Sequence, residues 1–189
     1  MIEAIIFDCF GVLTTETWLA FIDSLPERTD VDAVRQVRRA YTSGQISKQA
    51  CVRQIKELTG RVFTEAEDQE EVARNTIVLA YIRELRGRGY KIGLLSNIAS
   101  NWIRDSFLSP QEQALFDDMT LSFEVGIVKP DPRIFELACK RLGVDMNQTV
   151  LVDDIERYCM AAKEVGMAAV LYKDFKQFKA DLESILRAT

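Results

Sequence analysis

Polar side chains stand at the ends of three predicted strands that are far apart in the chain. They are Asp8, the pair Ser96-Asn97, and the pair Asp153-Asp154. A lysine, Lys129, stands in a loop just before a predicted helix. The carboxyl ends of parallel strands meet at one edge of a sheet, where such folds place their chemistry. We therefore expect these carboxylate, hydroxyl, amide and ammonium groups to form a single site.

The chain contains no histidine, which excludes Ser-His-Asp and Cys-His catalysis and histidine-bound zinc. Any catalysis therefore depends on carboxylates, lysine, hydroxyl groups or a metal ion held by oxygen. Each polar group also has an ordinary structural explanation. Asp8 and Ser96 are suited to turns or helix caps, and Asp153-Asp154 to a helix N-terminus. Lys129 alone is typical of a solvated surface, so the shared placement at strand ends is what favours a site.

Strands that alternate with helices predict an α/β fold, a Rossmann-like parallel sheet with helices on both faces. The predicted strands are Ala4 to Asp8, Lys91 to Leu95, Met119 to Phe123, Thr149 to Val152 and Ala168 to Tyr172. The predicted helices are Ile77 to Arg86, Trp102 to Leu108, Pro132 to Leu142, Ile155 to Val165 and Phe175 to Leu186.

The helical pattern of residues 15–75 predicts a small all-helical cap inserted directly after the first strand. Four helix signals support it: apolar spacing from Trp18 to Leu25, a cap at Asp30, a cap at Ser47 with Gly60 beyond, and a capping box from Thr64 to Glu67. The predicted domains are therefore a catalytic core, residues 1–14 and 76–189, and a cap, residues 15–75. Arg35, Arg38 and Arg39 form a basic cluster on one cap helix, where a solvated face is favoured over phosphate recognition.

Composition restricts the class of protein. The chain has 189 residues and a net charge of −5, with basic and acidic residues interspersed, which argues against nucleic acid or an anionic membrane as partner. No apolar run approaches the roughly 20 residues that span a bilayer, and the first strand lacks the basic region of a signal peptide. Four widely spaced cysteines without a CxxC pair predict reduced thiols in a cytoplasmic protein. The oligomeric state is not readable.

Four segments occur in an order that is similar to the haloacid dehalogenase-like hydrolase superfamily, whose members are mostly phosphatases. They are Phe7–Leu13, Leu94–Asn97, Lys129–Phe135 and Val150–Asp154. The third is quite specific, and the resemblance covers essentially the whole chain. The helical segment 15–75 resembles the helical cap that the family inserts after its first motif.

The resemblance implies the function of each site residue. Asp8 would be a nucleophile that forms a covalent intermediate, and Lys129 and Ser96 would also be catalytic. Ser96 and Asn97 would bind the substrate, a small phosphorylated metabolite. The cofactor would be Mg²⁺, which prefers oxygen ligands. Its ligands would be Asp8, the backbone carbonyl of Phe10, Asp153 and Asp154.

Phe10 departs from the family pattern, because the phosphatases usually carry a second aspartate at this position. That aspartate protonates the leaving group, a contribution typically worth about 10²–10⁴-fold. We therefore expect a slow phosphatase unless the leaving group is good. The dehalogenase branch has an aromatic residue here and works without metal, so dehalogenation is the alternative activity, which Asp153-Asp154 disfavours. A second alternative is a catalytically weak binding or regulatory relative. Ile155 and Tyr158 also differ from the small polar residue and asparagine that are common after the fourth motif.

Overall fold

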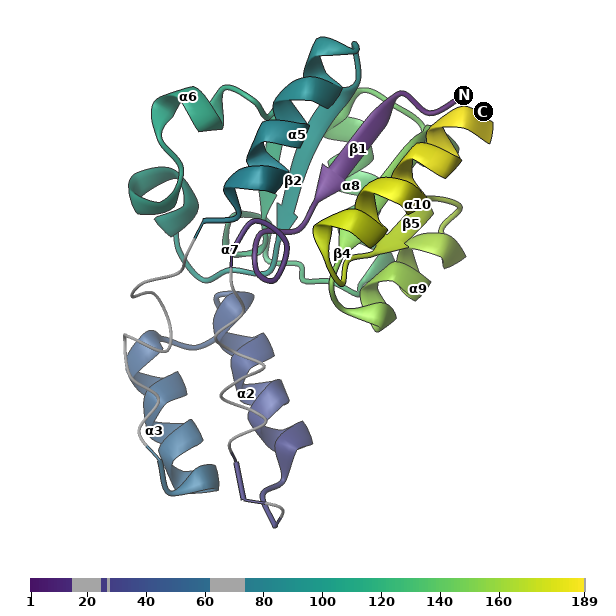
Figure 1. The fold of residues 1–189 in the computed structure, drawn as a ribbon. Helices are drawn as coiled ribbons and strands as arrows, with labels where there is room; N and C mark the ends of the chain where they lie inside the picture. Colours follow the sequence, from purple (N-terminus) through teal and green to yellow (C-terminus); the bar gives the residue numbers. More distant parts are fainter. Residues whose placement is uncertain (15–24, 27, 62–73, 189) are drawn as a thin grey trace.

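A computed structural model describes residues 1–14, 25–26, 28–61 and 74–188 of the chain. Its centre is a five-stranded sheet of β1 (Ala4–Phe7), β2 (Lys91–Ser96), β3 (Asp118–Leu121), β4 (Thr149–Asp153) and β5 (Ala168–Leu171). All neighbouring strands pair in parallel, in the order β3-β2-β1-β4-β5 (Figure 1). The strand order therefore reverses beside β1, at the position where open α/β sheets bind their ligands.

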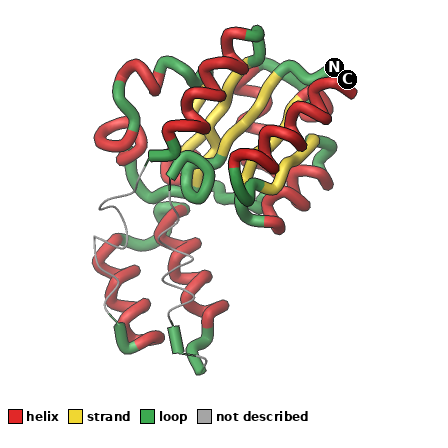
Figure 2. Tube along the Cα trace, viewed as in Figure 1, coloured by secondary structure: helices red, strands yellow, loops and turns green. Residues whose placement is uncertain are grey.

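Helices cover both faces of the sheet, as the sequence predicts (Figure 2). The four long ones are α5 (Thr76–Gly87), α8 (Pro132–Leu142), α9 (Glu156–Glu164) and α10 (Phe175–Ala188). Side chains alternate along β1: Ile5 and Phe7 pack with α5 and α10, whereas Ala4 and Ile6 pack with α8 and α9. Among the described residues, no helix combines the length and the apolar character that crossing a bilayer requires.

Short elements connect the strands, and two of them correct the sequence predictions. They are η1 (Ile103–Phe107), α6 (Pro110–Gln113), α7 (Ser122–Val125) and η2 (Met146–Gln148). The predicted helix from Trp102 to Leu108 is a single π-helical turn, η1. The predicted strand from Met119 to Phe123 ends at Leu121, because the Ser122 hydroxyl accepts a hydrogen bond from Ile98 N–H at 2.9 Å and the chain turns into α7.

Two helices, α2 (Val31–Thr42) and α3 (Lys48–Thr59), lie below the carboxyl edge of the sheet in Figure 1. Their N-caps are the predicted Asp30 and Ser47, and each side chain accepts from a backbone N–H in the first turn. This helical pair has its own apolar cluster around Val34, Cys51 and Ile55. The other two predicted cap helices lie outside the described residues, so the cap and its boundaries stay a prediction.

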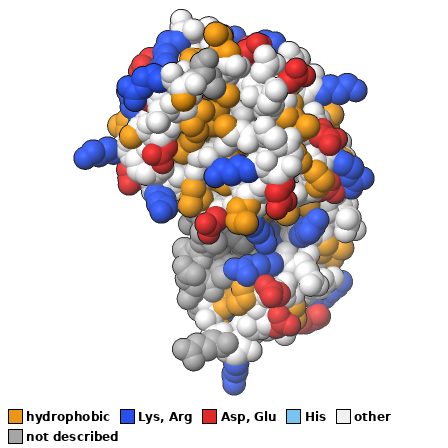
Figure 3. Space-filling model, turned by 90° about the vertical axis from the view of Figure 1, so that its right-hand side faces the viewer, with side chains coloured by type: hydrophobic (Ala, Val, Ile, Leu, Met, Phe, Trp, Pro, Cys, Tyr) orange, Lys and Arg blue, Asp and Glu red, His pale blue; other side chains and the backbone are white. Residues whose placement is uncertain are grey.

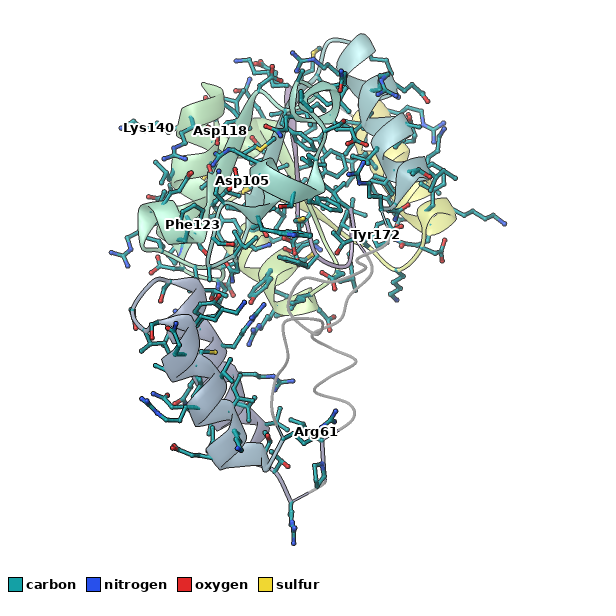
Figure 4. The ribbon with its side chains drawn as sticks, turned by 90° about the vertical axis from the view of Figure 1, so that its left-hand side faces the viewer. Arg61, Asp105, Asp118, Phe123, Lys140 and Tyr172 are labelled. Atoms are coloured by element: carbon teal, nitrogen blue, oxygen red, sulfur yellow. The ribbon has the colours of Figure 1, made fainter. Side chains whose placement is uncertain are left out.

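The chain segments that lead to and from the helical pair are fastened to each other and to the core. Thr14 and Arg74 form an antiparallel bridge. The Asn75 side-chain amide donates to the Val12 carbonyl at 2.9 Å and to the Tyr172 hydroxyl at 2.8 Å. Figure 4 places Tyr172 at the edge of the core that faces the helical pair.

At the end of α2, the Thr42 carbonyl oxygen lies 2.7 Å from the Ser122 hydroxyl of the core. This second attachment brings the C-terminal half of α2 close to the strand ends that carry the predicted site residues.

Candidate active site

Asp8 directly follows the central strand β1. Its backbone N–H donates to the Val152 carbonyl of β4 at 2.9 Å, which continues the pairing of β1 with β4 and fixes the backbone of Asp8. Its carboxylate is buried, and Oδ1 accepts a hydrogen bond from Cys9 N–H at 2.7 Å. Burial raises the pKa of Asp8 to about 8, although the nearby Lys129 charge opposes this rise.

Lys129 connects the ends of β1 and β4. Its Nζ lies 3.0 Å from Asp8 Oδ1 and 2.6 Å from Asp153 Oδ2, and its side chain is fully buried. Burial alone lowers the pKa of Lys129, but the charges of Asp153 and Asp8 raise it above its usual value. The lysine therefore stays protonated and provides a fixed positive charge between two carboxylates.

The Asn97 side chain holds the backbone of Lys129. Its Oδ1 accepts from Lys129 N–H at 2.8 Å, and its Nδ2 donates to the Lys129 carbonyl at 3.0 Å. Nδ2 also lies 3.3 Å from the Tyr158 hydroxyl. The structure thus places Asn97 at the cavity wall in contact with Lys129, and its predicted binding of substrate stays a prediction.

Three carboxylates meet at the ends of β1 and β4. Oxygen atoms of Asp8, Asp153 and Asp154 all lie within 4.8 Å of one another. Asp153 is fully buried, and its Oδ1 accepts from Ile155 N–H at 2.9 Å. A compact set of oxygen donors is what Mg²⁺ prefers in proteins, so these residues fit the predicted cofactor.

Gly11 leaves room for the third carboxylate. Its φ is +77°, and a Cβ at this position would lie 2.3 Å from Asp154 Oδ2. Any other residue at position 11 would therefore displace Asp154, in addition to adopting a left-handed backbone conformation that L side chains rarely adopt.

We expect Gly11→Ala to weaken Mg²⁺ activation and to lower stability by about 1–3 kcal/mol. Gly126→Ala is the matched control, because Gly126 has a φ of +68° and, apart from its chain neighbours, no described residue has an atom within 4 Å of the position that a Cβ would take. Both variants should melt at a lower temperature, but only Gly11→Ala should need more Mg²⁺ for half-maximal activity. Equal Mg²⁺ requirements in the two variants would contradict a metal role for Asp154.

Ser96 and Phe10 are the remaining predicted site residues. Ser96 closes β2, is fully buried, and its hydroxyl has no hydrogen-bond partner among the described residues. Buried hydroxyls nearly always have a partner, but Ser96 is not among the described residues that line the adjoining cavity, so its contact with the substrate stays a prediction. The Phe10 ring stacks on Trp102 with ring centroids 5.9 Å apart, and it forms an apolar wall. Its carbonyl as a metal ligand stays a prediction.

A cavity of about 640 Å³ opens above these groups, between the carboxyl edge of the sheet and α2. Asp8, Phe10, Asn97, Lys129 and Asp154 line it from the core. Arg35, Arg38 and Arg39 line it from α2, and Arg157 and Tyr158 from the start of α9. The arginine cluster thus lines the cavity while Arg35 and Arg39 are also exposed to solvent, so the solvated face that the sequence predicts is compatible with a role in ligand binding. Its spacing of three and four residues indicates a shared helix face but not which way that face points.

Sequence comparison now identifies the family. Residues 2–166 match the sequence model of the haloacid dehalogenase-like hydrolases, so the chain belongs to this family. A phosphatase from Mycobacterium tuberculosis is 29% identical over 190 residues, which cover 90% of this chain and 87% of that protein. The bifunctional epoxide hydrolase 2 of Sus scrofa is 28% identical over 131 residues, 66% of this chain but only 23% of that much longer protein.

Solved structures share the fold. A family enzyme from Bacteroides thetaiotaomicron in complex with magnesium and inorganic phosphate superposes with a TM-score of 0.63, at 21% identity, over 93% of this chain and 98% of that one. A dehalogenase superposes equally well, with a TM-score of 0.63 at 19% identity, over 89% and 83% of the two chains. The fold therefore does not distinguish a phosphatase from a dehalogenase, and any difference lies in the residues of the site.

Proposed function

We propose that this chain is a Mg²⁺-dependent phosphatase of small phosphorylated metabolites, with Asp8 as its nucleophile. The observation that carries the proposal is the buried Lys129, whose Nζ lies 3.0 Å from Asp8 and 2.6 Å from Asp153 within a cluster of three carboxylates. The three carboxylates fit the oxygen ligands of Mg²⁺, whereas a metal-free dehalogenase has no metal ion for such a cluster to bind. The phosphatase name of the mycobacterial relative supports the same activity.

In this mechanism, an Asp8 carboxylate oxygen attacks phosphorus, and the leaving group departs with the electrons of the broken P–O bond. Because Oδ1 already accepts from Cys9 N–H and contacts Lys129, we assign the attack to Oδ2. Water then attacks phosphorus, the P–O bond to Asp8 breaks, and inorganic phosphate leaves while the Asp8 carboxylate is restored. Lys129 balances the phosphoryl charge, and the Ser96 hydroxyl provides a donor. Bound Mg²⁺, held by Asp8, Asp153 and Asp154, would neutralise charge on the phosphoryl oxygens.

Phe10 restricts the substrates, since no carboxylic acid stands where phosphatase relatives protonate the leaving group. Phe10→Asp should raise kcat by about 10- to 100-fold for glycerol 3-phosphate, whose alkoxide leaving group needs a proton. The gain should be much smaller for para-nitrophenyl phosphate, whose leaving group does not. Phe10→Asn is the control, because it also removes the ring stacking on Trp102 without adding an acid. Equal kcat values for the Asp and Asn variants would mean that proton donation does not limit the rate.

Phe10 is also the observation that favours the second candidate function, a carbon–halogen hydrolase. A halide leaves without a proton, so an aromatic residue at position 10 does not slow the reaction of such an enzyme. The deciding experiment is hydrolysis of para-nitrophenyl phosphate with Mg²⁺ and with EDTA, in parallel with chloride release from 2-chloropropionate. Metal-dependent release of nitrophenol supports the phosphatase. Chloride release that persists in EDTA would contradict the phosphatase proposal and support a dehalogenase. No release from either compound would favour a binding role.

A further inference from the structure

Besides the carboxylate cluster, the described cavity wall contains four arginines and two further acids, Asp32 and Glu156. Arg35, Arg38 and Arg39 line it from one face of α2, and Arg157 lines it from α9. In Figure 3, Lys and Arg side chains gather where the helical pair meets the core. These four guanidinium groups line the same cavity as Asp8, but they come from helices α2 and α9 and not from the strand ends.

Contacts position Arg157 at the cavity wall, whereas Arg35 has only a weak, exposed partner. A guanidinium nitrogen of Arg157 lies 3.0 Å from the Tyr158 hydroxyl, and the group lies 4.9 Å from the centroid of that ring. Tyr158 is a neutral partner, so these contacts position Arg157 without neutralising its charge. Arg35 pairs with Asp32 at 3.2 Å, but both side chains are exposed to solvent, and such pairs are weak enough to give way to a ligand.

We propose that the cavity binds a phosphorylated metabolite that carries a second anionic group, a carboxylate or a second phosphate, and that these arginines hold that group. The inference rests on the proposed function, which assigns the phosphoryl group to Asp8 and Lys129. A cavity of about 640 Å³ is far larger than a phosphate ion requires and has the size of pockets that hold whole metabolites. Guanidinium groups match carboxylate and phosphate oxygens with two parallel hydrogen bonds.

A matched pair of ligands tests the inference independently of turnover. 3-Phosphoglycerate and glycerol 3-phosphate differ only by a carboxylate in place of a hydroxymethyl group. Calorimetry with Mg²⁺ and the Asp8→Asn variant, which lacks the proposed nucleophile, gives the affinity of each without hydrolysis. We expect 3-phosphoglycerate to bind at least about tenfold more tightly, because a charge-assisted hydrogen bond contributes that much. Comparison of the affinities for fructose 1,6-bisphosphate and fructose 6-phosphate tests in the same way whether a second phosphate is bound. Preference for either doubly anionic ligand supports the inference and shows whether the arginines select a carboxylate or a second phosphate.

Two charge-matched variants identify the groups responsible. Arg35→Gln/Arg39→Gln should remove most of the preference, because it should lower the affinity for 3-phosphoglycerate much more than the affinity for glycerol 3-phosphate. Arg53→Gln/Lys56→Gln removes the same charge from α3, which contributes none of the described lining residues, and should keep the preference.

Three results would overturn the inference: equal affinities within both ligand pairs, no measurable binding of any of the four ligands, or equal loss of preference in the two double variants. Nitrophenyl phosphate hydrolysis that persists in such a case would leave the phosphatase proposal standing. Conversely, ligand preference without any hydrolysis would overturn the phosphatase proposal and retain the arginine-lined wall as a binding site.

Discussion

Asp8→Asn is expected to abolish hydrolysis of para-nitrophenyl phosphate and, in metal-free protein, to raise the melting temperature. The loss of activity should be at least about a thousandfold, because an amide cannot replace the carboxylate that forms the covalent intermediate. The gain in stability follows from the surroundings of Asp8, a buried carboxylate next to those of Asp153 and Asp154. One fewer negative charge in this cluster leaves Lys129 still paired with Asp153 at 2.6 Å.

The pH dependence of this gain has a definite sign. Burial raises the pKa of Asp8 from 3.8 to about 8. An acid with a raised pKa in the folded state binds protons more tightly there than in the unfolded chain, so its cost to stability grows as the pH rises between those two values. The difference in melting temperature between Asp8→Asn and the wild type, measured in EDTA, should therefore increase from pH 5 to pH 8.

An exposed acid gives the control. Asp105 lies in η1 and is exposed, so Asp105→Asn should change neither activity nor the pH dependence of melting. Activity of Asp8→Asn close to that of the wild type would show that Asp8 is not the nucleophile. A melting temperature that falls at every pH would instead mean that the carboxylate contributes to the fold.

The sequence predicts those features that local chemistry decides. Buried strands appear as short apolar runs, and helices α2 and α3 begin at the predicted capping residues Asp30 and Ser47. The parallel sheet follows from the alternation of strands and helices, and it brings Asp8 and Asp153 together without any local signal between them.

Features that depend on tertiary contacts could not be predicted in the same way. The end of β3 depends on Ser122, whose hydroxyl bonds to the distant Ile98. Asn97 contacts the backbone of Lys129, 32 residues along the chain. The direction of the arginine face of α2 depends on how the helical pair is attached, including the contact of Thr42 with Ser122, and spacing along one helix carries no information about that attachment.

Lys129→Met is expected to have the largest effect on stability, because it leaves the buried carboxylates of Asp8 and Asp153 without their cation. Removal of one partner of a buried ion pair costs about 3–5 kcal/mol. Methionine has a similar length and apolar stem, so little of this cost should come from lost packing. The variant should also lose nitrophenyl phosphate hydrolysis, since the fixed positive charge next to the phosphoryl group is gone.

Melting temperatures at different pH values and with Mg²⁺ distinguish the loss of the Lys129 charge from the loss of its packing. Lys129 opposes the rise in the pKa of Asp8, so without it this carboxyl group holds its proton to a still higher pH. Because the pKa of Asp8 is already raised to about 8 in the wild type, the two proteins differ in bound protons only near and above that pH. The loss in melting temperature should therefore be smaller at pH 7 than at pH 9. Mg²⁺ should restore part of the loss, because a cation that binds only the folded state stabilises it.

Lys140→Met provides the reference, since Lys140 is exposed on α8 and its replacement should leave the melting temperature unchanged. A loss in Lys129→Met that is the same at both pH values and insensitive to Mg²⁺ would mean that Lys129 acts by filling space. In that case the proximity of its Nζ to Asp8 and Asp153 would not reflect a requirement for positive charge, and the proposal of a charge-balanced phosphoryl site would lose its main support.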